Sequence, residues 1–385
     1  MIAFIDLAAQ QARLKPSLDA AIAKVLAHGG YVMGPEVRAF EVELAAYCGA
    51  ELALSCANGT DALALPLMAW EIGGGEAVFC PSFTFAATPE VIAWTGATPV
   101  FVDILPDTYN LDPIHLEAAV AAVKAEGRLK PAAVIAVDLF GQSADYPRLA
   151  EVCRRHDLKL IADSAQGFGC TLGGAHPIAW ADAATTSFFP AKPLGCYGDG
   201  GAVLTNDAAF WGRMDSLRVH GKAVAGDIDG RAFDHDPKYL NARVGMNSRL
   251  DTLQAAILIE KLAIFADEIA ARQDVAARYA RGLDGVCLSV PKVIDGGLST
   301  WAQYVIEHEN RDGLAAHLKT LGIPTAVYYP VPMHLQIPYS GFPRGPGGLP
   351  VSEAKARTVI ALPMHPYLEP ETQDRIIEAV RGFNG

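Results

Sequence analysis

The stretch AAVIAVDLFGQSADYPRLAEVCRRHDLKLIAD, residues 132–163, decides the fold class. It opens with an apolar run at 132–138, continues through a segment of helical period at 144–156, and closes with a second apolar run at 158–163. Strands that are apolar along their whole length belong to sheets buried on both faces, and a helix between two such strands is typical of a parallel sheet. The stretch therefore predicts an α/β protein.

The same alternation continues on both sides of this stretch. Short β-branched runs end in Gly, Pro, Asp or Ser, and segments of helix length separate them. We expect a largely parallel sheet of about seven strands with helices on both faces. The predicted strands are 52–56, 77–80, 98–102, 132–138, 158–163, 183–188 and 202–205, and the predicted helices are 60–70, 88–94, 113–124, 144–156 and 207–219.

The sequence pattern changes after residue 219. A polar cap precedes apolar residues of helical spacing, which predict one long helix at 248–283 that joins two domains. We expect a large domain at 1–250 and a smaller α+β domain at 251–385. Within the smaller domain the expected strands are 302–307 and 325–329, the expected helices are 312–321 and 370–381, and the Gly- and Pro-rich segment 341–350 is expected to be a loop.

Composition excludes several classes of protein. The formal net charge is −12, which disfavours nucleic acid as a partner. Hydrophobic residues make up 51% of the chain, which disfavours disorder, yet no apolar run reaches the ~20 residues of a membrane span. The N-terminus lacks the features of a secretory signal, and the seven cysteines form no CxxC pair or histidine cluster. We expect a soluble cytoplasmic protein with reduced thiols and no metal site.

Polar side chains follow three of the predicted strands, and ligands of open parallel sheets bind at the carboxyl ends of strands. The first group is SCANGTD at 55–61, where a strand turns into a helix. Gly59 lets the backbone approach a bound group, and the free amides and the Thr60 hydroxyl could hold a phosphate. An ordinary helix cap is the alternative interpretation.

The second and third groups contain an acid and a lysine. Asp163 ends an apolar strand, where a buried carboxylate requires a cation or several donors, unless it only caps the next segment. Lys192 lies in SFFPAKPLGCYGDGG, residues 187–201, on a turn after a buried strand. Partial burial would lower the pKa of its amine and suit it to Schiff-base chemistry, whereas most single lysines are solvated surface residues. No GxGxxG motif or P-loop is present.

Six motifs taken together resemble the DegT/DnrJ/EryC1/StrS sugar aminotransferases, in the right order from Phe4 to the C-terminal tail. These enzymes depend on pyridoxal 5'-phosphate (PLP) and have the aspartate aminotransferase fold, PLP fold type I. The resemblance implies the same fold and cofactor here. The motifs are NGTDAL at Asn58, PSFTF at Pro81, GATPVFVDI at Gly96, DSAQ at Asp163, SFFPAKPLGCYGDGGA at Ser187 and NSRLDTLQAAIL at Asn247.

The resemblance also implies roles for individual residues. Lys192 would form the covalent link to PLP and, once freed, move a proton between substrate and cofactor carbons. Asp163 would keep the pyridine nitrogen protonated, so that the ring accepts electrons. The remaining cofactor contacts would be Gln166 beside the phenolic oxygen and Phe85 stacked over the pyridine. Gly59, Thr60 and Ser187 would form the phosphate cradle.

A further motif implies a shared site. Asn247 matches a residue that reaches the phosphate from the neighbouring subunit, so the resemblance implies a homodimer. Arg249 is a candidate for binding a substrate carboxylate through its planar guanidinium, or it pairs with Asp251 at a helix start. Tyr329 and His334 resemble residues that line the sugar side of the pocket, although both could be buried structural residues, and the same alternatives hold for His220.

The resemblance implies a ping-pong reaction in which L-glutamate donates its amino group and a nucleotide-linked keto sugar receives it. The sequence as a whole most resembles the branch of the family that acts on UDP-2-acetamido-2-deoxy-3-oxo-D-glucuronate. The product of that branch would supply bacterial surface polysaccharide such as O-antigen. Another dTDP-, UDP- or GDP-linked 3- or 4-keto sugar is the alternative. Related members often have His at the position of Tyr328 and Ser at that of Ala191, and the first departure bears on the choice of sugar.

Three other classes of protein compete with this interpretation. A PLP-dependent sugar dehydratase of the same fold would have histidine at the position of Lys192. A non-catalytic or regulatory relative would be expected to lose Lys192, Asp163 or the phosphate cradle. A sugar-nucleotide binding module without cofactor would not explain the lysine, acid and glutamine together. The residues present favour the aminotransferase.

Overall fold

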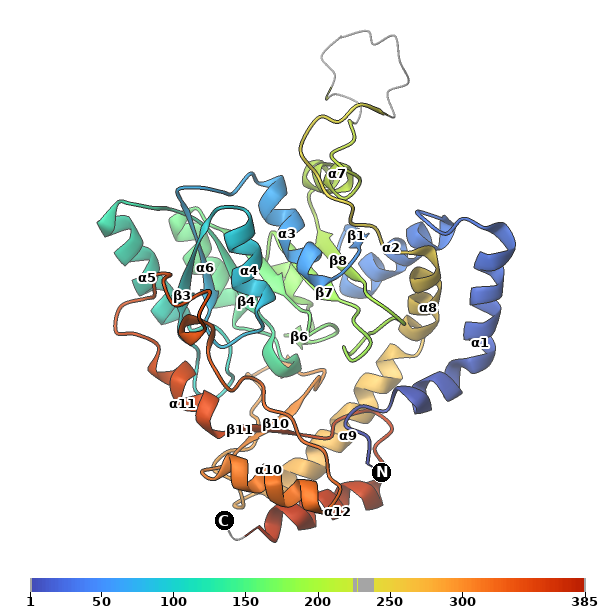
Figure 1. Ribbon diagram of the computed structural model, residues 1–385, viewed down its shortest axis with the longest axis vertical. Coiled ribbons are helices and arrows are strands. Elements are labelled where there is room, and N and C mark those ends of the chain that lie inside the picture. The colour runs from blue at the N-terminus through green and yellow to red at the C-terminus, as the bar shows by residue number, and fades with distance from the viewer. Residues whose placement is uncertain (1, 224–226, 228–238, 384–385) are drawn as a thin grey trace.

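The computed structural model describes residues 2–223, 227 and 239–383. Its centre is a seven-stranded sheet with the order β1-β8-β7-β5-β4-β2-β3 (Figure 1). All seven predicted strands are confirmed within two residues at each end. The strands are β1 (Leu52–Cys56), β2 (Glu76–Pro81), β3 (Thr98–Val102), β4 (Lys130–Val137), β5 (Lys159–Asp163), β7 (Ala183–Ser187) and β8 (Gly201–Thr205).

The register of the sheet brings the carboxyl ends of several strands together. β4, β5 and β7 are parallel, and Asp163 at the end of β5 pairs with Val137 of β4 and Thr185 of β7. β8 is antiparallel to both β7 and β1, so β1 runs in the same direction as β7. The polar segments that follow β1, β5 and β7 therefore lie along one edge of the sheet.

Helices cover both faces of this sheet, which explains why its strands are apolar throughout. Alternate residues of β4 and β5 enter different cores: Val134 and Leu160 face one, and Ile135 and Ile161 face the other. One face packs against α2 (Pro35–Cys48), α5 (Pro113–Glu126), α6 (Tyr146–His156) and α8 (Thr252–Leu262). The other face packs against α3 (Gly59–Ala69), α4 (Ala87–Trp94) and α7 (Ala208–Leu217).

The C-terminal part forms a smaller α+β unit around its own apolar cluster (Figure 1). Strand β10 (Tyr304–Glu307) pairs with β11 (Val359–Leu362) in an antiparallel ladder. Ile2 and Phe4 pack against this part, whereas α8 packs against α1 (Leu7–His28) and α2. The division at residue 250 stays a prediction. The other elements here are α9 (Phe265–Leu283), α10 (Arg311–Thr320), α11 (Pro350–Thr358) and α12 (Pro370–Arg381), and β6 (Thr171–Leu172) pairs with β9 (Gly297–Leu298).

Two predicted elements of the C-terminal part are wrong. The single helix at 248–283 is two helices, α8 and α9, separated at residues 263–264. Ile264 packs with α1 while Phe265 enters the main core, so tertiary packing ends α8 where no Gly or Pro marks the end. The predicted strand at 325–329 is a single bridge between Ala326 and Ala361.

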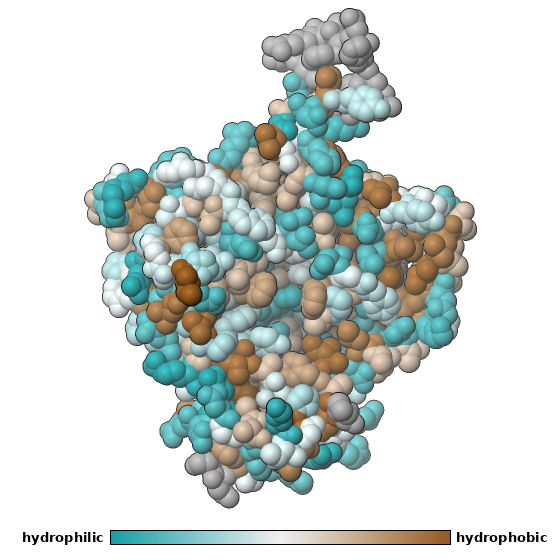
Figure 2. All heavy atoms as spheres, viewed as in Figure 1, coloured by the Kyte–Doolittle hydropathy of each residue, from teal (hydrophilic) through white to brown (hydrophobic). Residues whose placement is uncertain are grey.

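The surface shows polar and apolar side chains interspersed, with apolar ones gathering on the side of α1 and α8 (Figure 2). No helix in the described part of the chain is both long and apolar enough to cross a bilayer. Helices α1, α2 and α11 and strand β11 were not among the elements that the sequence pattern predicted. The apolar stripes of the three helices are short and interrupted by Ala and charged residues, so their helical period is weak.

Candidate active site

The turn after β1 lies directly against the end of β7. A Cβ atom on Gly59 would come within 2.5 Å of the Ser187 Cβ, so only glycine fits at this position. The Asn58 side chain caps α3 by accepting a hydrogen bond from the Asp61 amide at 2.8 Å. The capping role belongs to Asn58, which leaves the Gly59 and Thr60 amides at the positive end of the helix as donors for an anion.

Lys192 projects from the tight turn that follows β7. Its backbone amide donates to the Phe189 carbonyl at 2.8 Å, and its side chain is half-buried. Burial lowers the pKa of the Lys192 amine below the ordinary lysine value, while the charge of Asp163 acts in the opposite direction. Among the described residues the amine has no hydrogen-bond or ion-pair partner. It is therefore a candidate nucleophile rather than a solvated surface lysine.

Asp163 is the buried acid of the site. Its side chain is 6% exposed and accepts a hydrogen bond from the Ala165 amide at 3.1 Å. Burial raises the pKa of Asp163 to about 6, an effect partly offset by that hydrogen bond and by the charge of Lys192. Lys192 is the one described cation whose charge acts on this carboxylate, and it forms no ion pair with it, so the site contains a buried acid that can still accept a positively charged group.

Gln166 and two aromatic rings complete this side of the site. Gln166 is buried; its Oε1 accepts from the Phe140 amide and its Nε2 donates to the Tyr329 hydroxyl, both at 2.9 Å. The Phe85 ring is 58% exposed and its centroid lies 6.5 Å from that of Tyr329. Because Phe85 is large, apolar and exposed beside buried polar groups, its face is available to a planar ligand.

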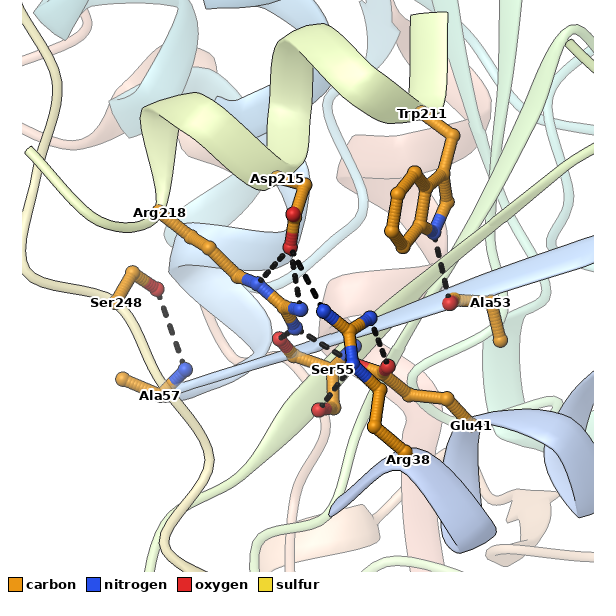
Figure 3. A network of polar contacts seen from close by, with 9 residues as sticks. All are labelled: Arg38, Glu41, Ala53, Ser55, Ala57, Trp211, Asp215, Arg218 and Ser248. Atoms are coloured by element: carbon orange, nitrogen blue, oxygen red, sulfur yellow. Dashed lines mark hydrogen bonds and ion pairs between the residues drawn. The ribbon is translucent and has the colours of Figure 1, made fainter. Parts of the chain in front are cut away.

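The segment that carries Asn247 and Arg249 lies next to the turn after β1. Ser248 joins the two, because its Oγ accepts from the Ala57 amide at 3.2 Å (Figure 3). Asn247 is exposed and Arg249 is half-buried. The alternative pairing of Arg249 with Asp251 is absent, and among the described residues the Arg249 guanidinium has no ion pair or hydrogen bond.

The sequence profile of the DegT/DnrJ/EryC1/StrS aminotransferase family matches residues 13–381. The chain belongs to this family. It is 45% identical to UDP-2-acetamido-2-deoxy-3-oxo-D-glucuronate aminotransferase of Pseudomonas aeruginosa, over 96% of each chain. It is also 39% identical to a pleiotropic regulatory protein of Geobacillus stearothermophilus, over 99% of this chain and 98% of the relative.

Solved structures agree with this membership. A DegT/DnrJ/EryC1/StrS aminotransferase from Brucella abortus is 51% identical and superposes with a TM-score of 0.95 over the whole of both chains. A structure from Bacillus subtilis with the bound cofactor PMP is 27% identical, with a TM-score of 0.81 over 98% of this chain and 82% of that one. The predicted fold type is confirmed, and the protein is a PLP-dependent aminotransferase.

The residues of this family member fit the cofactor by the chemistry of their donors. PLP has an aldehyde, a pyridine nitrogen, a phosphate and an aromatic face. The site offers an unpaired amine at Lys192, a buried acid at Asp163, helix amides at Gly59 and Thr60, and the exposed face of Phe85. Each functional group of the cofactor therefore has a complementary group along this edge of the sheet.

A buried arginine at the end of β1 was not identified from the sequence. The Arg218 guanidinium is fully buried and donates to the Ser55 carbonyl at 2.5 Å and to Glu41 Oε1 at 2.6 Å (Figure 3). Asp215 accepts from the same guanidinium, and the Arg218 carbonyl accepts from the Ser248 amide at 2.9 Å. Arg218 thus fixes the end of β1 and the 247–249 segment together. Its acidic partners, Glu41 and Asp215, lie on α2 and α7, and no local sequence motif predicts this pairing.

His334 is held on both sides of its ring. Its Nδ1 lies 2.7 Å from Ser82 Oγ and its Nε2 lies 3.2 Å from Glu353 Oε1, and the residue is 4% exposed. These contacts favour the structural alternative for His334 over substrate binding. His220 adopts a left-handed backbone conformation with φ of 66° and bonds the Met246 carbonyl through its amide. This position in the turn favours the structural alternative for His220 as well.

A second buried acid, Asp138, lies one strand away from Asp163. Its Oδ1 accepts from the Ala144 amide at 3.0 Å and from the Tyr146 hydroxyl at 2.8 Å, and its Oδ2 accepts from the Ser164 hydroxyl at 2.6 Å. Its backbone amide donates to the Asp163 carbonyl at 2.9 Å. Asp138 therefore organises the turn that follows Asp163.

The two acids predict how stability depends on pH in the cofactor-free protein. Burial raises the pKa of Asp138 to about 7 and that of Asp163 to about 6. Because both values lie above those of the unfolded chain, the folded state gains stability at low pH and loses it as pH rises from about 4 to about 7. Asp138→Asn should make the free energy of unfolding less dependent on pH, so that less stability is lost by pH 8. Urea unfolding at several pH values measures this. An unchanged profile would contradict the burial argument.

Proposed function

We propose that the protein transfers the amino group of L-glutamate to UDP-2-acetamido-2-deoxy-3-oxo-D-glucuronate. The observation that carries this proposal is the 45% identity with the Pseudomonas aeruginosa enzyme of that name over almost the whole of both chains. The unpaired guanidinium of Arg249 adds support, because it could bind the carboxylate of glutamate or that of the uronate in a two-point manner. The 3-amino sugar would serve bacterial surface polysaccharide such as O-antigen, made in the cytoplasm.

Each residue of the site has a role in this proposal. Bound PLP supplies an aldehyde that takes up the amino group and a ring that accepts electrons. Lys192 Nζ would hold the cofactor and, once freed, would carry a proton between the Cα atom of glutamate and the cofactor carbon, and Asp163 would keep a proton on the pyridine nitrogen. Gln166 and Phe85 orient the ring. The phosphate binds at the Gly59 and Thr60 amides beside Ser187, and Tyr329 contacts the sugar.

We also propose a homodimer with shared sites. Asn247 is exposed, and it would complete the phosphate site of the neighbouring subunit as the family resemblance implies. Large apolar side chains on segments near the same edge are exposed in the single chain, a pattern that favours association. These side chains are Phe85, Phe189, Val331 and Leu335.

Two alternatives differ from this proposal in specific observations. Relatives that share 36–38% identity have names that specify other nucleotide-linked sugars, including dTDP-linked ones. Because Tyr328 departs from the histidine that related members often have, another nucleotide-linked keto sugar is the first alternative. The regulatory relative is the second alternative. Because Lys192, Asp163 and the phosphate cradle are all present, an enzyme is the better account.

The visible absorption spectrum of the PLP-loaded protein tests this proposal. We expect the band of the lysine-linked cofactor to fade with L-glutamate and to return with the 3-oxo uronate sugar nucleotide. A dTDP-linked 3-keto sugar without a carboxylate is the matched control and should restore the band much more slowly. Fading without recovery would refute the uronate substrate, and the absence of any band would refute the assignment of Lys192.

A further inference from the structure

The turn that carries Lys192 is compact and closed at its base. The Phe188 amide donates to the Gly200 carbonyl at 2.7 Å, and the Cys196 amide donates to the Phe188 carbonyl at 2.8 Å. Gly195 lies so close to the start of the turn that a Cβ atom there would be 2.5 Å from the Pro190 carbonyl oxygen. These backbone contacts fix the base of the turn, at Phe188, Cys196 and Gly200. The far side of the turn, at Gly195 and Tyr197, is held by another element.

Helix α8 holds that far side through two side chains. The Lys261 ammonium donates to the Gly195 carbonyl at 2.6 Å and lies 4.2 Å from the centroid of the Tyr197 ring. Gln254, two turns earlier on the same helix, accepts from the Tyr197 amide at 2.8 Å. Lys261 thus reaches the turn three residues after Lys192, by a hydrogen bond and a cation–π contact.

Burial of the Lys261 ammonium at this position is energetically unfavourable. It is 1% exposed, and among the described residues no carboxylate lies within ion-pair distance of its ammonium. Burial lowers the pKa of Lys261 to about 8, while Cys196 and Glu268 oppose that shift. Its place in the last turn of α8 gives the charge some compensation from the helix dipole. An apolar side chain of similar volume would satisfy packing alone without burying a charge.

We propose that Lys261 is a positioning residue for Lys192: by binding the Gly195 carbonyl and the Tyr197 ring, it fixes the turn from which Lys192 reaches the cofactor. The inference rests on the proposed role of Lys192 as the linking lysine. Loss of the Lys261 contacts would leave the base of the turn closed and its far side free. The lysine amine would then occupy the productive position for a smaller fraction of the time.

Lys261→Met tests this inference, because it keeps the length of the side chain and removes the charge and the donors. We expect the apoenzyme of this variant to form the linked-cofactor band about tenfold or more slowly than wild type, and kcat to fall with little change in KM. Hydrogen exchange of the cofactor-free protein should be faster at the amides of residues 192–197. Lys261→Gln keeps a donor for the Gly195 carbonyl and should recover part of both effects.

Lys355→Met is the matched control, because it removes another largely buried ammonium, which pairs with Glu307 at 2.7 Å away from the turn. It should lower thermal stability without slowing cofactor linkage. Linkage and exchange at wild-type rates in Lys261→Met would overturn the proposal. If Lys261→Met does not fold, Lys261→Gln takes its place, because it also loses the charge beside the Tyr197 ring, and linkage and exchange at full wild-type rates in Lys261→Gln would then overturn the proposal. If wild type itself forms no link, the role of Lys192 fails, and exchange of the turn still decides whether Lys261 holds it.

Discussion

Replacing Lys192 with alanine is expected to lower kcat for transamination roughly 10⁴-fold or more, because in the proposed mechanism this one amine would both link to the cofactor and move the proton. Its side chain is the only amine within the turn after β7, and its neighbours offer no substitute: the Lys261 ammonium is bound to the Gly195 carbonyl. The variant should still bind PLP without a covalent link. Borohydride reduction followed by peptide mapping measures the link, and steady-state kinetics measure the rate.

Lys319→Ala is the control, because Lys319 is exposed on α10 and should be dispensable. Both variants should melt within a few degrees of wild type, since the Lys192 amine forms no hydrogen bond or ion pair among the described residues and Lys319 is exposed. A borohydride-stable adduct in Lys192→Ala would show that another lysine carries the cofactor.

The Lys192→Ala variant also tests the shared site. Mixed with Asn247→Ala under conditions that exchange subunits, it should give heterodimers in which one of the two sites has both Lys192 and Asn247. Activity should then recover in part. Absence of recovery after exchange has been verified would mean that Asn247 acts within its own subunit.

The sequence predicted most of the sheet because its strands are buried on both faces. In β4 and β5 every residue from Val134 to Val137 and from Leu160 to Asp163 is buried, so the apolar runs were continuous and their ends were marked by Asp138 and Asp163. The same rule located the candidate site, since a parallel sheet brings the polar residues at its strand ends together. The Gly59 turn, Asp163 and Ser187 lie at such ends.

The parts that sequence reasoning missed depend on contacts between distant residues. Ser248 and Ala57 are 191 positions apart, and Lys261 and Gly195 are 66 apart. No local pattern distinguishes a lysine that binds a carbonyl from one that faces solvent. The break between α8 and α9 has the same origin, because Ile264 and Phe265 turn toward different clusters although their sequence continues the helical period.

Asp163→Asn is the second variant with a large expected effect, and it should separate activity from stability. The neutral amide cannot stabilise a protonated pyridine nitrogen, so kcat should fall roughly 10³-fold. Stability of the cofactor-free protein should not fall, because burial raises the pKa of Asp163 to about 6 and the folded state above that pH contains an unfavourable charge that asparagine removes. Kinetics and urea unfolding at pH 8 measure the two quantities.

The pH dependence of cofactor binding gives the same variant a sharper test. In wild type, protonation of Asp163 as pH falls through about 6 would remove the negative charge that is proposed to pair with the pyridine, so PLP affinity should decline over that range. Asp163→Asn should bind PLP more weakly but without this decline. Asp182→Asn is the control, since Asp182 accepts from the Leu160 amide near the opposite end of β5 at 2.9 Å. A decline of equal size in Asp163→Asn would assign the titration to another group, with Asp138 the nearest candidate.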